Sequence, residues 1–153
     1  MAVLFEVFED AGTDVAKARL LIGAGADPTA VNEAGWSPLL LAAQRGLLPV
    51  MEAMTSQSDI LDAPSPDGRR PIHEAAAHGH DDVVAWLLSH EVSPTSVDGD
   101  GQTALHRAAI RGHTATVALL LDQGAPLEAV DAQGNTAFLA AVDGGTRETV
   151  ELL

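Results

Sequence analysis

The chain has 153 residues, of which 46% are hydrophobic and only 3% aromatic. Its 22 acidic and 8 basic residues give a formal net charge of −14, which opposes binding to nucleic acid and to anionic membrane surfaces. No apolar run approaches the ~20 residues that span a bilayer, and the acidic N-terminus is unlike a secretory signal. The absence of cysteine excludes disulfides and thiolate chemistry. We therefore expect a soluble, intracellular and cytoplasmic protein.

Glycines recur with a fixed period along the chain. One set is spaced by 33 residues and consists of Gly35, Gly68, Gly101 and Gly134. A second set follows each of these eleven residues later and consists of Gly46, Gly79, Gly112 and Gly145. A period of this length indicates a stacked array, in which one unit cannot bury its apolar face without its neighbours.

The first unit, residues 1–31, departs from the pattern of the later ones. Phe5 and Phe8 are expected in the core, whereas the link at residues 12–14 is one residue longer than its counterparts. A helix that ends near residues 20–22 matches the later units. We interpret this unit as an N-terminal cap.

The exit from the second unit, at residues 58–66, lacks the glycine that ends the first and fourth units at Gly25 and Gly124. We therefore expect a looser junction there.

The fourth unit, residues 98–130, shows the two-helix pattern most clearly. Thr103 is suited to cap a first helix, and Gly112 to end it. Val117 and residues 119–121 then give the apolar spacing of a second helix. Three alanine pairs permit close approach of neighbouring first helices: Ala42 and Ala43, Ala75 and Ala76, and Ala108 and Ala109.

These residues closely resemble the ankyrin repeat, with its turn Asp and Gly, its T-P-L-H-x-A-A helix start and its Gly-His link. The resemblance implies an all-α solenoid of stacked helix-turn-helix units with β-hairpin-like fingers. It implies a single domain over residues 1–153, with approximate repeats 1–31, 32–64, 65–97, 98–130 and an incomplete 131–153. Because the chain stops inside the second helix of the fifth unit, we expect either a piece of a longer protein or a protein with an unusual end.

His73 and His106 occupy the histidine position of the motif. The resemblance implies that each ties its helix start to the preceding turn, and that His80 and His113 in the Gly-His links are structural as well. Leu40 and Leu139 replace the motif histidine in the other copies, so no repeating catalytic ring exists.

The densest polar cluster consists of His73, Glu74, His78, His80, Asp81 and Asp82. Its imidazoles and carboxylates could ligate zinc. However, the family pattern accounts for two of the histidines, and the two aspartates fit the first turn of a helix, where the helix dipole favours acids. No nucleotide-binding or nucleophile motif is present. We expect neither a metal nor a cofactor, and no enzyme activity.

Trp36 stands where the other units carry Arg69, Gln102 and Asn135. In ankyrin repeats this position projects from the finger into the concave face and varies with the partner. The alternative is an indole ring folded onto neighbouring fingers.

Five of the eight basic residues lie on fingers or on exposed first-helix positions: Arg45, Arg69, Arg70, Arg107 and Arg111. They would suit an acidic peptide, since arginine binds carboxylates in a bidentate manner. The alternative is internal pairing with the nearby Asp67, Glu74, Asp98 and Asp100.

The function expected from these features is a monomeric, non-catalytic module that binds a protein or peptide, including acidic segments, on its concave face. The expected partner-binding residues are Trp36, Arg45, Asp67, Arg69, His78, Asp100, Gln102, Arg107, Arg111 and Asn135. Two alternatives remain: a regulatory or targeting segment of a larger enzyme or effector, and a hydrolase that uses the histidine cluster.

Overall fold

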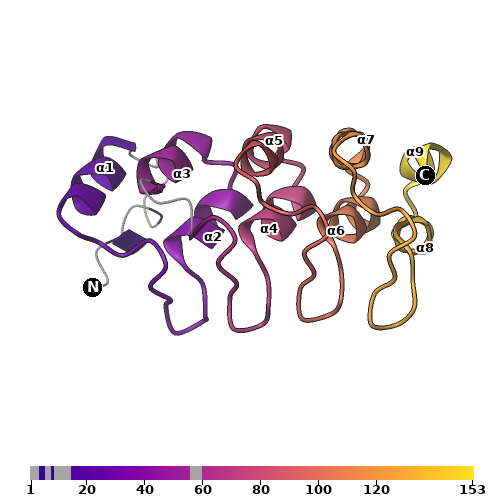
Figure 1. Cartoon of the computed structure of the whole chain (residues 1–153), viewed down its shortest axis with the longest axis horizontal. Coiled ribbons are helices and arrows are strands. Elements are labelled where there is room, and N and C mark those ends of the chain that lie inside the picture. The colour runs from indigo at the N-terminus through magenta and orange to yellow at the C-terminus, as the bar shows by residue number, and fades with distance from the viewer. Residues whose placement is uncertain (1–3, 6–7, 9–14, 56–59) are drawn as a thin grey trace.

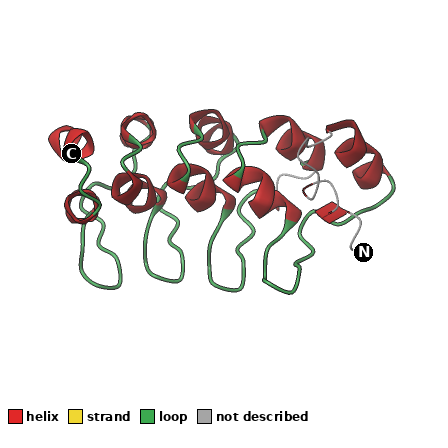
Figure 2. Cartoon of the chain, turned by 180° about the vertical axis from the view of Figure 1, so that it is seen from behind, coloured by secondary structure: helices red, strands yellow, loops and turns green. Residues whose placement is uncertain are grey.

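The computed structural model describes residues 4–5, 8, 15–55 and 60–153. This part of the chain contains nine α-helices and no β-strand (Figures 1 and 2), which confirms the all-α solenoid. The helices are α1 (Val15–Gly23), α2 (Pro38–Gln44), α3 (Leu48–Met54), α4 (Pro71–Ala77), α5 (Asp81–Ser89), α6 (Ala104–Arg111), α7 (Thr114–Asp122), α8 (Ala137–Asp143) and α9 (Arg147–Leu152).

The helices form two rows, with a row of extended loops below them (Figure 1). The first helices α2, α4, α6 and α8 follow one another along the middle row, and the second helices α1, α3, α5, α7 and α9 form the other row. Each inner first helix packs between two others, as α4 does between α2 and α6. The helices α1 and α9 therefore lie at opposite ends of an elongated stack.

The first helices begin and end as the sequence predicts. The Ser37 hydroxyl accepts the Leu40 N–H at 3.2 Å, and Thr103 and Thr136 cap α6 and α8 in the same way. Gly112 ends α6 in the left-handed conformation, at φ 73°.

Small side chains let the first helices approach one another. All six alanines of the three predicted pairs are fully buried, at 0% exposure. The leucines and valines of the second helices fill the remaining space, with Val83, Leu87, Val117 and Leu120 also at 0%. The core is therefore a continuous layer between the helix rows, as expected for a stacked array.

Each loop below the helices is a tight hairpin, here called a finger. The N–H of its first residue donates to the carbonyl of its fifth, and these pairs are Asn32 and Trp36, Ser65 and Arg69, Asp98 and Gln102, and Asp131 and Asn135. A glycine with positive φ stands fourth in every finger. Within the described ranges, the isolated bridge between Val97 and Thr103 is the only sheet-like pairing, so the fingers are hairpin turns rather than strands.

The motif histidines hold their own helix starts and also link successive units. His73 Nδ1 accepts the Arg70 N–H at 3.2 Å, while Nε2 donates to the Ser96 carbonyl at 3.0 Å. His106 likewise reaches the Asn135 carbonyl at 2.9 Å. The expected tie to the preceding turn is present, since Nδ1 of each ring accepts the N–H of the residue that follows its own finger. Each ring also binds the following unit, which was not expected.

The Gly-His link residues connect units as well. His80 Nε2 donates to the Gln44 carbonyl at 2.8 Å, and His113 Nε2 to the Ala77 carbonyl at 3.0 Å. Thr146, at the equivalent position, donates to the Ala109 carbonyl at 3.2 Å. The structural role expected for these two histidines is confirmed.

The N-terminal unit is described in part. Leu4 and Phe8 are buried, Phe5 is half-buried, and α1 packs against α3. The unusual link at residues 12–14 lies outside the described residues.

The expected looser junction lies partly outside the described residues as well, since residues 56–59 are not described. In its described part, Leu61 is buried, and the Asp62 carboxylate pairs with Arg70 at 2.8 Å.

Candidate functional site

The fingers and the first helices α2, α4, α6 and α8 together form one surface, here called the finger face. All ten residues predicted to bind a partner lie on it, and all are at least partly exposed. Six belong to fingers: Trp36, Asp67, Arg69, Asp100, Gln102 and Asn135. The other four lie in or directly after first helices: Arg45, His78, Arg107 and Arg111.

Trp36 contacts the second finger and stays partly exposed. The Arg69 guanidinium lies 5.9 Å from the centre of the indole ring. The backbone N–H of Trp36 donates to Asn32 Oδ1 at 2.9 Å, and this bond fixes the backbone that carries the indole ring. The structure thus combines the two alternatives, because the ring packs on its neighbour and still faces solvent.

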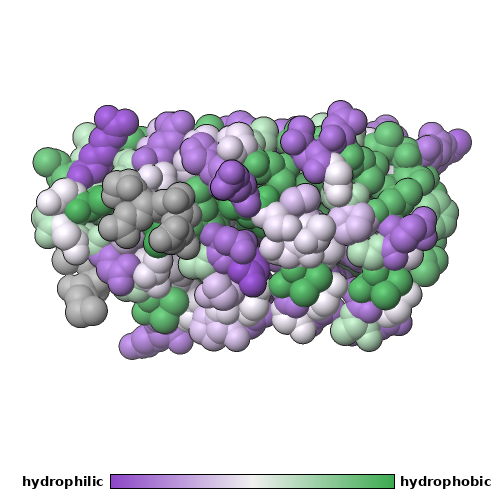
Figure 3. All heavy atoms as spheres, viewed as in Figure 1, coloured by the Kyte–Doolittle hydropathy of each residue, from purple (hydrophilic) through white to green (hydrophobic). Residues whose placement is uncertain are grey.

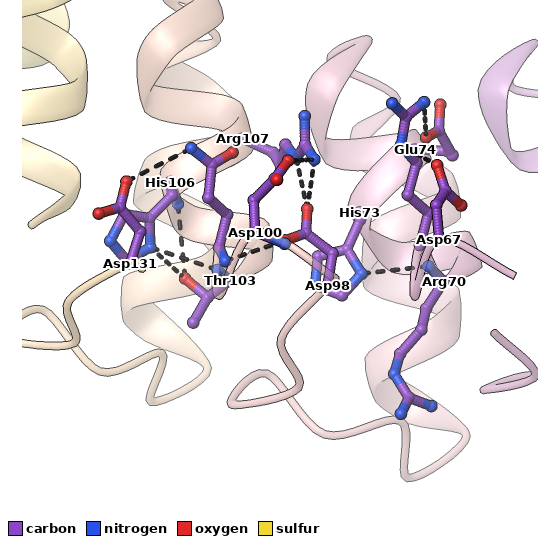
Figure 4. A network of polar contacts seen from close by, with 12 residues as sticks. Asp67, Arg70, His73, Glu74, Asp98, Asp100, Thr103, His106, Arg107 and Asp131 are labelled. Carbon is purple, nitrogen blue, oxygen red and sulfur yellow. Dashed lines mark hydrogen bonds and ion pairs between the residues drawn. The ribbon is translucent and has the colours of Figure 1, made fainter. Parts of the chain in front are cut away.

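Arg69 is held by two carboxylates. Its Nε lies 3.0 Å from Asp67 Oδ2, and Nη1 lies 3.5 Å from Glu74 Oε1 (Figure 4). The Glu74 side chain is only 7% exposed, so Arg69 supplies the charge that a buried carboxylate needs. The Ser65 hydroxyl donates to Asp67, and this bond, helped by Arg69, lowers the pKa of Asp67.

Arg107 repeats this arrangement one unit further along. Its guanidinium binds the buried Asp98 carboxylate through two nitrogens, with Nε at 2.7 Å, and lies 3.3 Å from Asp100. The other Asp98 oxygen accepts the backbone N–H groups of Asp100 and Gln102. Asp98 therefore shapes the third finger and holds the arginine above it (Figure 4).

Two of the three remaining arginines of the finger face also have partners. Arg45 donates to the Phe8 carbonyl at 2.8 Å and lies over the Phe8 ring, so it ties the N-terminal unit to α2. Arg70 pairs with Asp62. Arg111 makes no ion pair with any residue that the structure describes.

The centre of the finger face is consequently acidic. Four carboxylates, from Asp67, Glu74, Asp98 and Asp100, meet the two guanidinium groups of Arg69 and Arg107. This arrangement favours the pairing alternative over a groove for acidic peptides, because the arginine donors are already engaged.

The fourth finger and His78 complete the face. Asp131 Oδ1 accepts the N–H groups of Gln133 and Asn135, and these bonds lower its pKa, with that of Asn135 contributing most. Gln102 reaches Asp131 across the fingers at 3.5 Å. His78 Nδ1 donates to the Glu74 carbonyl at 2.9 Å, and its ring stacks on that of His80.

The histidine cluster shows no catalytic or metal-binding arrangement. Both His73 nitrogens are engaged by backbone groups, and burial lowers the pKa of this imidazole. His78 and His80 each bond a separate carbonyl. In the described ranges, no three His, Cys, Asp or Glu side chains are placed to hold a metal ion.

Sequence reasoning missed the hydrogen bonds that join neighbouring fingers. The Gly99 N–H donates to the Asp67 carbonyl at 3.1 Å, and the Ala132 N–H to the Asp100 carbonyl at 2.9 Å. Pro66, which stands 33 residues before Gly99, has no N–H to donate. A proline at this repeat position was the available signal.

None of the described helices combines the length and the apolar character that a membrane crossing requires. A profile of the family described as ankyrin repeats (many copies) matches residues 72–121 and 105–153, together more than half of the chain. No curated protein shows significant similarity to this chain. The matched segments contain the His73 and His106 links, the two Gly-His connections and three successive first helices. The chain therefore belongs to the ankyrin repeat family.

Proposed function

We propose that this chain is a non-catalytic module that binds a protein or peptide partner on its finger face. Ankyrin repeats are generally protein–protein interaction modules. The observation that carries the proposal is the set of hydrogen bonds that fixes each finger, both within the finger and, for the last three, to its neighbour. Such a surface loses little conformational entropy when a partner binds.

The row of residues that ends the four fingers is the strongest candidate for selecting the partner. Trp36, Arg69, Gln102 and Asn135 occupy equivalent positions, are partly exposed and differ in chemistry. Among them, Trp36 offers the largest apolar area, and tryptophan and arginine dominate interface hot spots.

The negative charge of the finger face favours one class of partner over another. A net excess of carboxylates repels phosphate backbones, so we propose a protein or peptide rather than nucleic acid. A monomeric state and an intracellular location remain parts of the proposal; the absence of cysteine in the chain supports the latter. A regulatory or targeting segment of a larger enzyme or effector would use the same face.

The test compares two triple variants as baits for quantitative capture of partners from a cell extract. The finger-face variant carries Trp36→Ala, Gln102→Ala and Arg111→Glu. The control carries Glu52→Ala, Ala85→Gln and Ala115→Gln, which change exposed positions on the second helices α3, α5 and α7.

A partner recovered with the wild type should be kept by the control and lost by the finger-face variant. With the purified partner, Trp36→Ala alone should cost ~2 kcal/mol or more of binding free energy. Equal retention by both triple variants would place the binding surface elsewhere.

A further inference from the structure

The first two fingers lack the hydrogen bond that joins the other neighbouring fingers. Between fingers two and three, and between three and four, a backbone N–H donates to the Asp67 or Asp100 carbonyl. The equivalent carbonyl in the first finger belongs to Ala34, and the residue equivalent to the donors Gly99 and Ala132 is Pro66. Since proline has no N–H, the bond cannot form.

Pro66 nevertheless holds the same place in the stack as Gly99 and Ala132. A Cβ added to Gly35 would lie 3.2 Å from Pro66 Cδ. One added to Gly68 or Gly101 would lie 2.7 Å from the Gly99 nitrogen or 2.9 Å from the Ala132 nitrogen. The gap between the first two fingers is therefore in register with the gaps between the later fingers, and it differs only because Pro66 has no backbone N–H to donate.

This interval contains a pocket of about 180 Å³. It is lined by Ala34, Gly35, Trp36, Ser65, Asp67 and Arg69. The Ala34 carbonyl receives no hydrogen bond from any residue that the structure describes. A residue with an unused acceptor and the partly exposed Trp36 thus line the same pocket.

Two acceptor-bearing residues line the pocket, Ala34 with its unused carbonyl and Asp67 with its carboxylate. The Asp67 side chain is 59% exposed. The cationic donor of the pocket, Arg69, is engaged by Asp67 and Glu74, and these two carboxylates exceed its single charge by one. A ligand that donates hydrogen bonds fits these acceptors, and a positive charge matches the local excess of carboxylate.

We propose that the gap between the first two fingers is a subsite for a lysine or arginine side chain in an extended basic segment of the protein partner. The ligand's N–H groups bond the Ala34 carbonyl and the Asp67 carboxylate, and its methylene stem packs on the Trp36 ring. An anionic group would instead meet two acceptors. This inference rests on the proposed function, because it names the chemistry that the finger face selects.

The test detects binding through the indole ring of Trp36. The chain has two tryptophans, so Trp86→Phe leaves Trp36 as the sole indole probe. Three capped pentapeptides, Ac-Gly-Ala-Lys-Ala-Gly-NH2 and its counterparts with Glu or Leu in place of Lys, are titrated while indole fluorescence and the indole N–H NMR signal are recorded. The lysine peptide should bind at least fivefold more tightly than the leucine peptide, and added salt should weaken that preference. Equal responses to the three peptides would overturn the subsite.

Two variants examine the two acceptors separately. Asp67→Asn removes the charge, and Pro66→Ala restores an N–H that can bond the Ala34 carbonyl and close the interval. Each should weaken binding of the lysine peptide at least fivefold, whereas Gln133→Ala, at an exposed position of the fourth finger, should not. Urea unfolding of every variant verifies that it folds. Unchanged binding by both folded variants would also overturn the subsite.

Different experimental results would contradict the subsite and the proposed function. If the finger-face triple variant loses the partner while Asp67→Asn and Pro66→Ala keep it fully, the function stands and the subsite is overturned. If the triple variant keeps the partner, the proposed function itself fails, and with it the assignment of this pocket to the partner.

Discussion

Glu91 has a backbone conformation that residues other than glycine rarely adopt. Its φ is 65°, and it is the one non-glycine residue with positive φ among those that the structure describes. Gly25 and Gly124 occupy the equivalent positions of other units, with φ 88° and 82°. The left-handed region costs a residue with a Cβ about 1–2 kcal/mol. Glu91 therefore stores local strain after α5.

Replacing Glu91 with glycine should relieve this strain. Because glycine also makes the unfolded chain more flexible, the expected net gain in the free energy of unfolding is about 0.5–1 kcal/mol. Urea unfolding measures it. Glu91→Ala keeps the Cβ and should give no gain, so an equal effect of both substitutions would contradict the explanation.

His73 makes the stability of the stack depend on pH. Burial lowers its pKa in the folded chain, the nearby Arg107 and Arg70 add to this, and the Ser96 carbonyl and Asp98 oppose it. In the unfolded chain an imidazole binds its proton near pH 6.5. Below that pH the unfolded state therefore takes up more protons than the folded state, which lowers stability as the pH falls.

The free energy of unfolding should thus be retained above about pH 6.5 and decrease as the pH falls below it. The Asp67 and Asp131 carboxylates, whose pKa values are lowered, should add a separate loss below about pH 4. His73→Gln should remove part of the decrease between pH 7.5 and 5.5. His90→Gln, at an exposed position, should leave that decrease unchanged.

At the scale of the helices, close packing of the first helices limits side-chain size. Ala75 on α4 is fully buried, and α4 lies between α2 and α6. Ala75→Leu should lower the free energy of unfolding by ~1–3 kcal/mol through overpacking. The same substitution at Ala85, exposed on α5, should change it by less than about 0.5 kcal/mol. Denaturant unfolding that shows equal effects at the two sites would contradict the packing argument.

At the scale of the whole molecule, the C-terminal end of the stack leaves apolar side chains exposed. Phe138, Leu139 and Val142 on α8 are 42%, 44% and 49% exposed, and apolar side chains appear toward that end in Figure 3. Leu105, equivalent to Phe138, is fully buried. A repeat array is stabilised by contacts between neighbours, so helices with one neighbour gain less than inner ones.

Amide hydrogen exchange should therefore be slowest in α4 and α6 and fastest in α8 and α9. Mass spectrometry of the exchanging chain resolves these segments. As a matched pair, Phe138→Ala should destabilise the chain less than Leu105→Ala, which is expected to cost about 2–5 kcal/mol. Uniform exchange along the stack would contradict this prediction.

Much of the fold could be predicted because it follows from short-range rules repeated in register. The 33-residue glycine period, the alanine pairs, the Thr103 cap and the Gly112 end each reflect local steric or hydrogen-bonding preferences. The positions exposed on the finger face followed from the same register, and the structure confirms that the predicted residues are accessible there. Their binding to a partner stays a prediction.

The tertiary structure decided which groups meet across the units. It showed that Arg69 and Arg107 are engaged by carboxylates and that His73 and His106 bond the following unit. It also showed that Pro66 lies beside Gly35 of the first finger, 31 residues earlier, and that the Ala34 carbonyl there receives no hydrogen bond from the described residues. Local patterns place a residue on a face, but a charge pair or an unused acceptor depends on distances set by the stacking of whole units.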